Sequence, residues 1–224
     1  MRIGVISDAH GNIEGLEAAL DGLGGTGRVF FLGDSVGYYP FPNEVIARLR
    51  EAGVECLAGN HDAMITGRLP VDPERAEAYN LPLIRSLLTE ENLEWLRRLP
   101  SSRELWLGGR RILMCHGSPW DPLEEYIYPD FDGFERFAAL DYDLVLLGHT
   151  HWPLVRRRGR TLVVNPGSCG QPRDRVPGAS YARVDLDEME AELRRADFEP
   201  YRLLAEAQLL GLPPKLIEYF GRPS

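Results

Sequence analysis

Cysteine is scarce in this sequence, and hydrophobic runs long enough to cross a membrane are missing. The three cysteines, Cys56, Cys115 and Cys169, are odd in number and form no CxxC motif, so we expect no disulfide framework and a reducing environment. The longest apolar runs have the length of a strand, which predicts no transmembrane helix and no membrane partner. The first residues enter an apolar segment without the layout of a signal peptide. These features together predict a cytoplasmic protein.

Positive charge is also in deficit. The chain has 25 Lys and Arg against 34 Asp and Glu, a net charge of −9. This balance disfavours a broad electrostatic grip on duplex nucleic acid, without excluding a nuclease, and it still permits a small anion at a locally positive site. The basic run RRRGR at 156–160 predicts the tip of a hairpin with arginines facing solvent, rather than a nucleic-acid contact.

Linkers, repeats and low-complexity segments are absent too, and 224 residues suit a single domain, 1–224. The first quarter of the chain alternates buried-strand and amphipathic-helix patterns, which is typical of an α/β fold with parallel pairing. The predicted strands here are 2–6, 28–34 and 54–60, and the predicted helices are 12–23 and 42–53.

The later chain predicts a different mixture of elements. Residues 72–99 are charged and indicate two inserted helices covering one edge of the site, and the tail, 199–220, is helical. Further predicted elements are hairpins at 104–117 and 153–167, a helix at 132–141, a strand at 143–151 and a strand pair at 179–198. The early helices and late hairpins predict an α/β (α+β) fold with two sheets packed face to face and helices outside.

All five histidines of the chain follow predicted apolar strands, accompanied by carboxylates and one asparagine. In chain order, the polar clusters that follow these strands are Asp8 with His10, Asp34, Asn60 with His61 and Asp62, His116, and His149 with His151. Because ligands of α/β sheets bind at the carboxyl ends of strands, we expect these side chains to meet at one edge. Residues at i and i+2 of an extended strand point to the same side, so Asp8 with His10 and His149 with His151 are predicted chelating pairs.

Histidine, aspartate and asparagine are ligands for divalent metals, and no sulfur is needed to complete this set. Seven candidate ligands exceed what one ion takes while keeping an open position, so they suit two ions that share a carboxylate. Each cluster alone is weak evidence, because Gly-Asp is a turn signal and GNHD fits a capped turn. In order, each after a strand, they indicate a metal site.

This pattern resembles the calcineurin-like metallophosphoesterase superfamily, whose signature reads D-x-H, G-D, G-N-H-[DE], a lone His and G-H-x-H. The corresponding blocks are Asp8-Ala9-His10, Gly33-Asp34, Gly59-Asn60-His61-Asp62, His116 and Gly148-His149-Thr150-His151. The stretches GDSVGYYPFPNEVI and VVNPGSCGQPRD further resemble a branch of small, stand-alone prokaryotic members. The resemblance implies a four-layer sandwich of two central mixed β-sheets flanked by helices.

The resemblance also implies two divalent metal ions with separate ligand sets. Asp34 would bridge them, together with a water or hydroxide. The other implied ligands are Asp8, His10 and His151 for one ion, and Asn60, His116 and His149 for the second. The ions could be manganese, iron, zinc or nickel, because nitrogen and oxygen ligands do not choose among these metals.

His61 would not be a ligand in this scheme. It would protonate the leaving-group oxygen or brace the phosphate, with Asp62 setting its tautomer. The candidate substrate contacts are Asn12, Tyr38 and Arg173; for Asn12 helix capping is the favoured alternative, and for Arg173 a solvated loop. We expect Cys115 and Cys169 to be small core residues rather than nucleophiles.

The sequence thus favours an enzyme that hydrolyses a small phosphodiester of the nucleotide or cyclic-nucleotide type. The alternatives are a phosphomonoesterase or protein phosphatase, and a non-catalytic metal-binding scaffold. The scaffold is disfavoured because no ligand position of the signature is lost. The sequence leaves homo-oligomerisation open.

Overall fold

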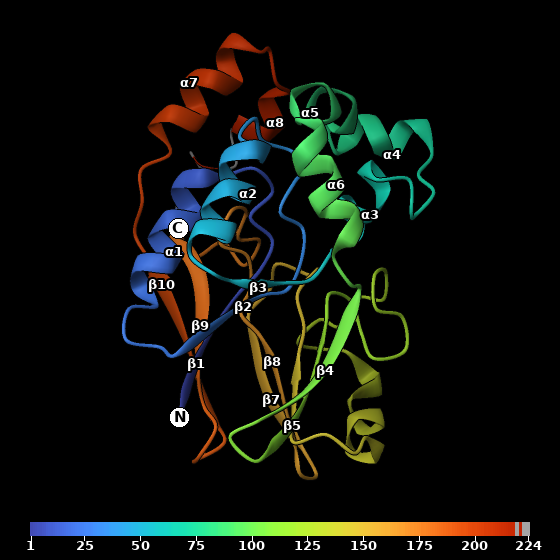
Figure 1. Ribbon diagram of the computed structural model, residues 1–224, viewed down its shortest axis with the longest axis vertical. Helices are drawn as coiled ribbons and strands as arrows, with labels where there is room; N and C mark the ends of the chain where they lie inside the picture. The colour runs from blue at the N-terminus through green and yellow to red at the C-terminus, as the bar shows by residue number, and fades with distance from the viewer. Residues whose placement is uncertain (218–219, 221–224) are drawn as a thin grey trace.

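The computed structural model describes residues 1–217 and 220 of the chain. Two mixed β-sheets, each of five strands, pack face to face with helices outside them (Figure 1). The strand order is β10-β9-β1-β2-β3 in the first sheet and β4-β5-β6-β8-β7 in the second. This confirms the predicted arrangement of two central sheets flanked by helices.

The first sheet contains the early strands and the last strand pair. Its members are β1 (Arg2–Ile6), β2 (Arg28–Phe31), β3 (Glu55–Cys56), β9 (Ala179–Asp185) and β10 (Glu190–Ala196). Strands β1, β2 and β3 are parallel, whereas β9 runs antiparallel to both β1 and β10. The two crossovers are α1 (Ile13–Gly22) and α2 (Pro42–Glu51), so the β-α-β-α-β order expected from the sequence is present.

The second sheet contains the two predicted hairpins and the strand between them. Its members are β4 (Ser102–Leu107), β5 (Arg110–Cys115), β6 (Leu144–Leu146), β7 (Leu154–Arg158) and β8 (Thr161–Asn165). The strands β5, β6 and β8 are parallel, and β4 and β7 pair antiparallel at the two edges. The carboxyl ends of β5 and β6 therefore point to the same side of this sheet.

Apolar side chains divide into layers that match this architecture. Between the sheets lies the largest core cluster, which includes Val5, Phe30, Met114, Leu144 and Val164. A second cluster joins the outer face of the first sheet to α1 and α2, and a third joins the outer face of the second sheet to the 3₁₀ helix η1 (Asp132–Ala139). The order of layers is thus helices, sheet, sheet, helix.

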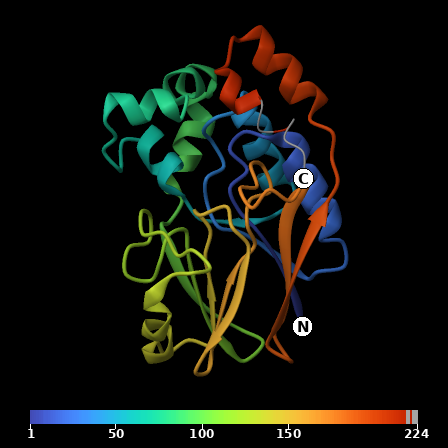
Figure 2. The ribbon, with the colours of Figure 1, turned by 180° about the vertical axis from the view of Figure 1, so that it is seen from behind.

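The remaining helices lie above the strand ends, in the upper half of Figure 1. They are α3 (Asn60–Ile65), α4 (Pro73–Ala78), α5 (Leu81–Leu87), α6 (Glu90–Arg98), α7 (Tyr201–Leu209) and α8 (Pro214–Ile217). Figure 2 shows from behind that α7 and α8 cross the top of the molecule, while η1 lies at the opposite end. The helical tail packs on Tyr38 and Tyr39, in the loop that follows β2.

Three sequence predictions need correction here. Strand β3 is two residues long, and Asn60 begins α3 instead of ending a strand over 54–60. The segment 72–99 forms three helices rather than two, because Asn80 adopts a left-handed conformation (φ 59°) that separates α4 from α5. The strand predicted over 143–151 ends at Leu146, so the histidines after it lie in a turn.

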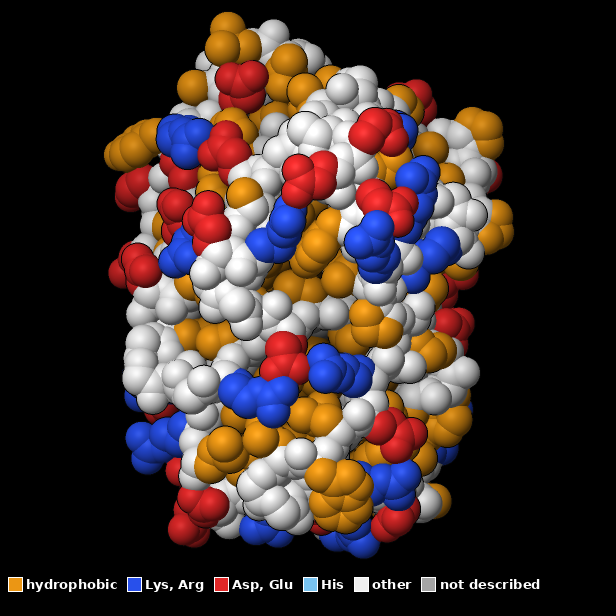
Figure 3. Space-filling view, in the orientation of Figure 1, with side chains coloured by type: hydrophobic (Ala, Val, Ile, Leu, Met, Phe, Trp, Pro, Cys, Tyr) orange, Lys and Arg blue, Asp and Glu red, His pale blue; other side chains and the backbone are white. Residues whose placement is uncertain are grey.

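Charged side chains of both signs are interspersed on the face shown in Figure 3, with no broad basic band. The described residues contain no helix long and apolar enough to cross a bilayer.

Candidate active site

The predicted site residues converge above the carboxyl ends of β1, β2, β5 and β6, between the strands and the upper helices. Among the described residues, three groups have donor atoms within 4.8 Å of one another: Asp8, His10 and His151; His10, Asp34 and His61; and Asp34, His116 and His149. All these side chains are buried. The loops of both sheets therefore supply one compact polar cluster.

The residues of the two predicted chelating pairs all enter the cluster, but only Asp8 and His10 share a donor group, whereas His149 and His151 fall in different groups. Asp8, His10, His149 and His151 have φ values of 58°, 52°, 67° and 60°, so they lie in left-handed turns beyond the strands rather than on extended backbone. Such a conformation costs a non-glycine residue about 1–2 kcal/mol. Strain of this kind is concentrated at functional sites and is maintained by the surrounding structure.

Three histidine rings are oriented by backbone carbonyl groups. Nδ1 of His10 donates to the carbonyl of Val36 (3.2 Å), and Nδ1 of His116 donates to the carbonyl of Leu32 (2.8 Å). Nδ1 of His151 donates to the carbonyl of Gln171 (2.7 Å). A carbonyl only accepts hydrogen bonds, so Nδ1 carries the proton and the Nε2 of each neutral ring presents a lone pair to the cluster.

These lone pairs face other acceptors, which is unfavourable without a cation. Nε2 of His10 lies 2.9 Å from Nε2 of His151, and in the neutral form of His116 its Nε2 faces Oδ1 of Asn60 at 3.1 Å. Within the described part of the chain, buried Oδ1 of Asp8 has no hydrogen-bond partner. Nitrogen and oxygen lone pairs that converge in this way are the chemistry that a divalent metal ion requires, so these residues fit such an ion.

Burial keeps most of the rings in the form that can bind a metal. It lowers the pKa of His149 to about 3, and it lowers the pKa of His10 and His151 well below the usual histidine value. Burial also lowers the pKa of His116, but the Asp34 and Asp8 carboxylates outweigh it and raise that pKa to about 9. His116 is therefore the ring that holds a proton on Nε2 when no cation is present.

Asp34 occupies the centre of the cluster. Its Oδ2 lies 3.3 Å from Nε2 of His116 and 3.6 Å from Nε2 of His10, and its Oδ1 accepts the backbone N–H of His61 (2.9 Å). A Cβ on Gly59 would lie 2.1 Å from Oδ1 of Asp34, so only glycine permits this approach. Asp34 is thus the carboxylate that lies between the two outer groups.

Asp62 does not contact the ring of His61 as predicted. Its carboxylate accepts the backbone N–H groups of Asp34 (2.9 Å), Ser35 (3.1 Å), Val36 (3.2 Å) and Gly59 (2.9 Å), and the Ser35 hydroxyl (2.8 Å). Burial raises the pKa of Asp62 to about 6, so the carboxyl is ionised at neutral pH. Asp62 therefore fixes the loop that carries Asp34 and is a positioning residue.

The ring of His61 is held by packing instead. Its Nδ1 is buried and makes no hydrogen bond with any described residue, its Nε2 lies 3.9 Å from Oδ2 of Asp34, and Tyr79 covers the ring at 4.3 Å between centroids. Gly37 has a φ of 112°, and a Cβ there would lie 2.4 Å from Nδ1 of His61. Glycine at 37 is needed to make room for this imidazole.

The three predicted substrate contacts have different outcomes. Asn12 is fully buried, accepts the N–H of Gly15 (3.0 Å) and donates to the carbonyl of Gly170 (2.9 Å), so its side chain caps α1, the favoured alternative. Tyr38 and Arg173 line a pocket of about 90 Å³ at the cluster, and an Arg173 Nη2 donates to the Tyr38 hydroxyl (3.1 Å). The pocket is completed by Asp34, Asn60, His61, Tyr79, Tyr126, His149 and His151.

Sequence reasoning missed Tyr79 and Tyr126. Tyr79 follows α4, and Tyr126 lies in the irregular segment before η1; neither belongs to a signature block. The ring of Tyr126 stacks on His149 at 3.9 Å between centroids. The only available signal was the aromatic cluster EEYIYPD that follows the His116 block.

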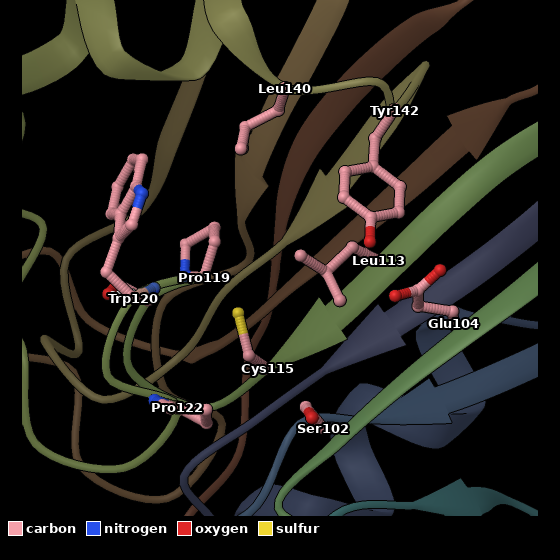
Figure 4. Close-up of a pocket in the computed structure, with 10 residues that line it drawn as sticks. Ser102, Glu104, Leu113, Cys115, Pro119, Trp120, Pro122, Leu140 and Tyr142 are labelled. Atoms are coloured by element: carbon pink, nitrogen blue, oxygen red, sulfur yellow. Dashed lines mark hydrogen bonds between the residues drawn. The ribbon is translucent and has the colours of Figure 1, made fainter.

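A second pocket, of about 300 Å³, lies on the outer face of the second sheet (Figure 4). The Cys115 sulfur points into it beside Leu113 and Pro119, whereas the next residue, His116, points into the polar cluster. Burial also raises the pKa of the Cys115 thiol well above its usual value. As expected, Cys115 is a core residue on the face away from the candidate active site.

Two packed mixed sheets with a buried cluster of His, Asp and Asn at their shared edge define the class of metallophosphoesterases. The sequence model of the calcineurin-like phosphoesterase superfamily domain matches residues 1–189, and the chain belongs to this family. The resemblance seen in the sequence is thereby confirmed, and the family is metal-dependent.

Individual relatives agree with this assignment. A metallophosphoesterase from Sphaerobacter thermophilus has a similar structure, with a TM-score of 0.84 and 32% identity over 99% of this chain and 98% of that one. The protein MJ0912 of Methanocaldococcus jannaschii is 32% identical over 88% of both chains. The phosphodiesterase YfcE of Escherichia coli is 26% identical over 84% of this chain and 89% of its own.

Proposed function

We propose that the protein hydrolyses a small phosphodiester at the Asp34 cluster with two divalent metal ions. The observation that carries this proposal is the position of Asp34 between two donor groups, each completed by histidines with inward lone pairs. The proposed ligands are Asp8, His10 and His151 on one side, Asn60, His116 and His149 on the other, and Asp34 between them. The name of the related E. coli phosphodiesterase supports the diester preference.

When bound, the ions would neutralise phosphate oxygens and lower the pKa of a water, so that hydroxide is available near neutral pH to attack phosphorus. The chain itself has to position the ester and supply a proton. Arg173 and Tyr38 lie at the wall of the pocket, where the guanidinium can pair with a phosphate oxygen. His61 lines the same pocket. Burial lowers the pKa of its ring to about 4, the Asp34 carboxylate opposes this shift, and the protonated ring can give its proton to the departing alkoxide oxygen.

The size of the pocket limits what it can hold. A volume of about 90 Å³ is well below the roughly 300–1,000 Å³ of a typical ligand pocket. We therefore expect the pocket to hold the phosphoryl group, while the alcohol part of the ester extends through its mouth.

The direct test is hydrolysis by protein that has been stripped with chelator and reloaded with manganese. Bis-p-nitrophenyl phosphate and p-nitrophenyl phosphate are compared, and bound metal per chain is measured by mass spectrometry. We expect manganese-dependent turnover of the diester and two ions per chain. A preference for the monoester would make the protein a phosphatase, and two bound ions without turnover of either compound would favour the scaffold.

A further inference from the structure

Two exposed tyrosines lie in the segment between β5 and η1, and the first of them, Tyr126, lines the pocket. Tyr126 is 40% exposed and Tyr128 is 37% exposed, and their rings are parallel within 4°, with centroids 5.7 Å apart. The Tyr126 ring also stacks on His149, inside the cluster. The rings of His149, Tyr126 and Tyr128 thus form a continuous series from the buried site to solvent.

The segment that carries these rings is anchored to the fold. Ile127, between the two tyrosines, is 1% exposed and belongs to the core cluster under the second sheet. Ile127 is buried while both of its tyrosine neighbours are exposed, so the segment presents Tyr126 and Tyr128 on its outer side. Just before them, Glu125 accepts from Arg136 at 3.0 Å and from the hydroxyl of Ser118. The aromatic pair is therefore presented on a fixed support.

We propose that Tyr126 and Tyr128 form a stacking platform for a planar aromatic ring attached to the phosphoryl group of the substrate. This inference rests on the proposed function, because the phosphoryl group would be held at Asp34. The pocket is small and Tyr126 forms part of its wall, so an ester that extends along this wall meets the two tyrosines. Parallel aromatic rings bind planar rings through their faces and bury apolar area.

The platform predicts which property of the substrate is recognised. Stacking on an aromatic face tolerates any base, because every base has a π face. The pocket is lined by two residues of fixed charge, Asp34 and Arg173, and both belong with the phosphoryl group and the metal ions of the proposed function. The occupant is therefore a planar ring such as a nucleobase or a simple aryl group, recognised with little discrimination among bases.

The experiment compares probes that differ only in aromaticity. Benzyl methyl phosphate and cyclohexylmethyl methyl phosphate have similar alcohols and similar size, so their kcat/KM ratio isolates stacking from general hydrophobic contact. The methyl ester of thymidine 5′-phosphate and its abasic analogue show whether a nucleobase uses the same platform. We expect the aromatic member of each pair to be favoured about tenfold, equivalent to about 1.4 kcal/mol.

Variants assign the preference to the two rings. Tyr126→Ala and Tyr128→Ala should bring both ratios close to one, Tyr126→Phe and Tyr128→Phe should retain them, and Tyr201→Ala, at a 72% exposed tyrosine of α7, should have no effect. Because each ratio compares two probes on one protein, any change in metal content cancels. A wild-type ratio near one, or ratios that survive both alanine variants, would overturn the platform.

A binding measurement separates this inference from the proposed function. Calorimetric Kd values for methyl benzylphosphonate and methyl cyclohexylmethylphosphonate do not depend on turnover. If no ester is hydrolysed but the benzyl compound still binds about tenfold more tightly than its partner, equivalent to about 1.4 kcal/mol, the platform stands and the catalytic proposal fails. Equal Kd values would refute the platform even in an active enzyme.

Discussion

The replacement Asp62→Asn tests whether this carboxylate positions the loop of Asp34 or acts through His61. The two oxygens of Asp62 share five donors: four backbone N–H groups and the Ser35 hydroxyl. An asparagine keeps the shape of the side chain but turns one oxygen into an NH₂ group. Whichever oxygen is replaced, at least two of these buried donors lose their acceptor.

The expected cost follows from that count. A buried donor without a partner costs about 1–3 kcal/mol, so two of them should lower the free energy of unfolding by about 2–6 kcal/mol. This is a large part of the total for a domain, about 5–15 kcal/mol. The measurement is urea unfolding followed by circular dichroism, on chelator-treated protein at pH 8, where Asp62 with its pKa of about 6 is ionised.

A matched control is available at Asp72, which is exposed and caps α4 by accepting the single N–H of Arg75 (2.9 Å). Asparagine caps as well as aspartate, so Asp72→Asn should leave the free energy of unfolding almost unchanged. If Asp62→Asn also left stability unchanged while turnover fell, the positioning role would be refuted. Asp62 would then act on the imidazole of His61, as the sequence predicted.

Three further replacements test the proposed roles. Asp34→Asn should reduce bound metal measured by mass spectrometry, because a neutral amide cannot join both donor groups; unchanged metal content would contradict its central role. His61→Ala should keep wild-type metal content and lower the turnover of bis-p-nitrophenyl phosphate by about 10²–10⁴-fold, the usual effect of a general acid; full activity would remove the ring from the mechanism. Cys115→Ser should leave turnover nearly intact, since the sulfur faces the outer pocket; complete loss would point to a thiol mechanism.

The sequence predicted which residues form the site better than it predicted their backbone conformation. Residues such as Asp34 and His116 could be found because each follows a strand whose hydrophobic run is visible in the sequence. The left-handed turns at His10 and His149 could not be found, since hydrophobic periodicity carries no information about φ in the residues after a strand. The pairing predicted from extended backbone was therefore wrong in its geometry, and His149 and His151 fall in different donor groups.

Longer-range contacts explain the other misses. Tyr126 enters the pocket because its neighbours Ile127 and Glu125 are held in place, Ile127 by the second sheet and Glu125 by Arg136. The second sheet and Arg136 are not adjacent to Tyr126 in the sequence. Asp62 lies next to His61 along the chain, yet it serves the loop after β2 because α3 directs neighbouring side chains in different directions. The positions of the Tyr126 and Asp62 side chains are thus set by tertiary packing and not by the local sequence pattern.

The histidines that meet at the cluster are far apart along the chain, and this has a consequence for folding. His10 and His151 are separated by 141 positions and belong to loops of different sheets. A ligand bound between them would act as a reversible cross-link across the seam between the sheets, and it would favour only the state in which both sheets are docked. The amount of metal available would then set how often the two halves of the sandwich separate, and with it the lifetime of the protein against proteolysis.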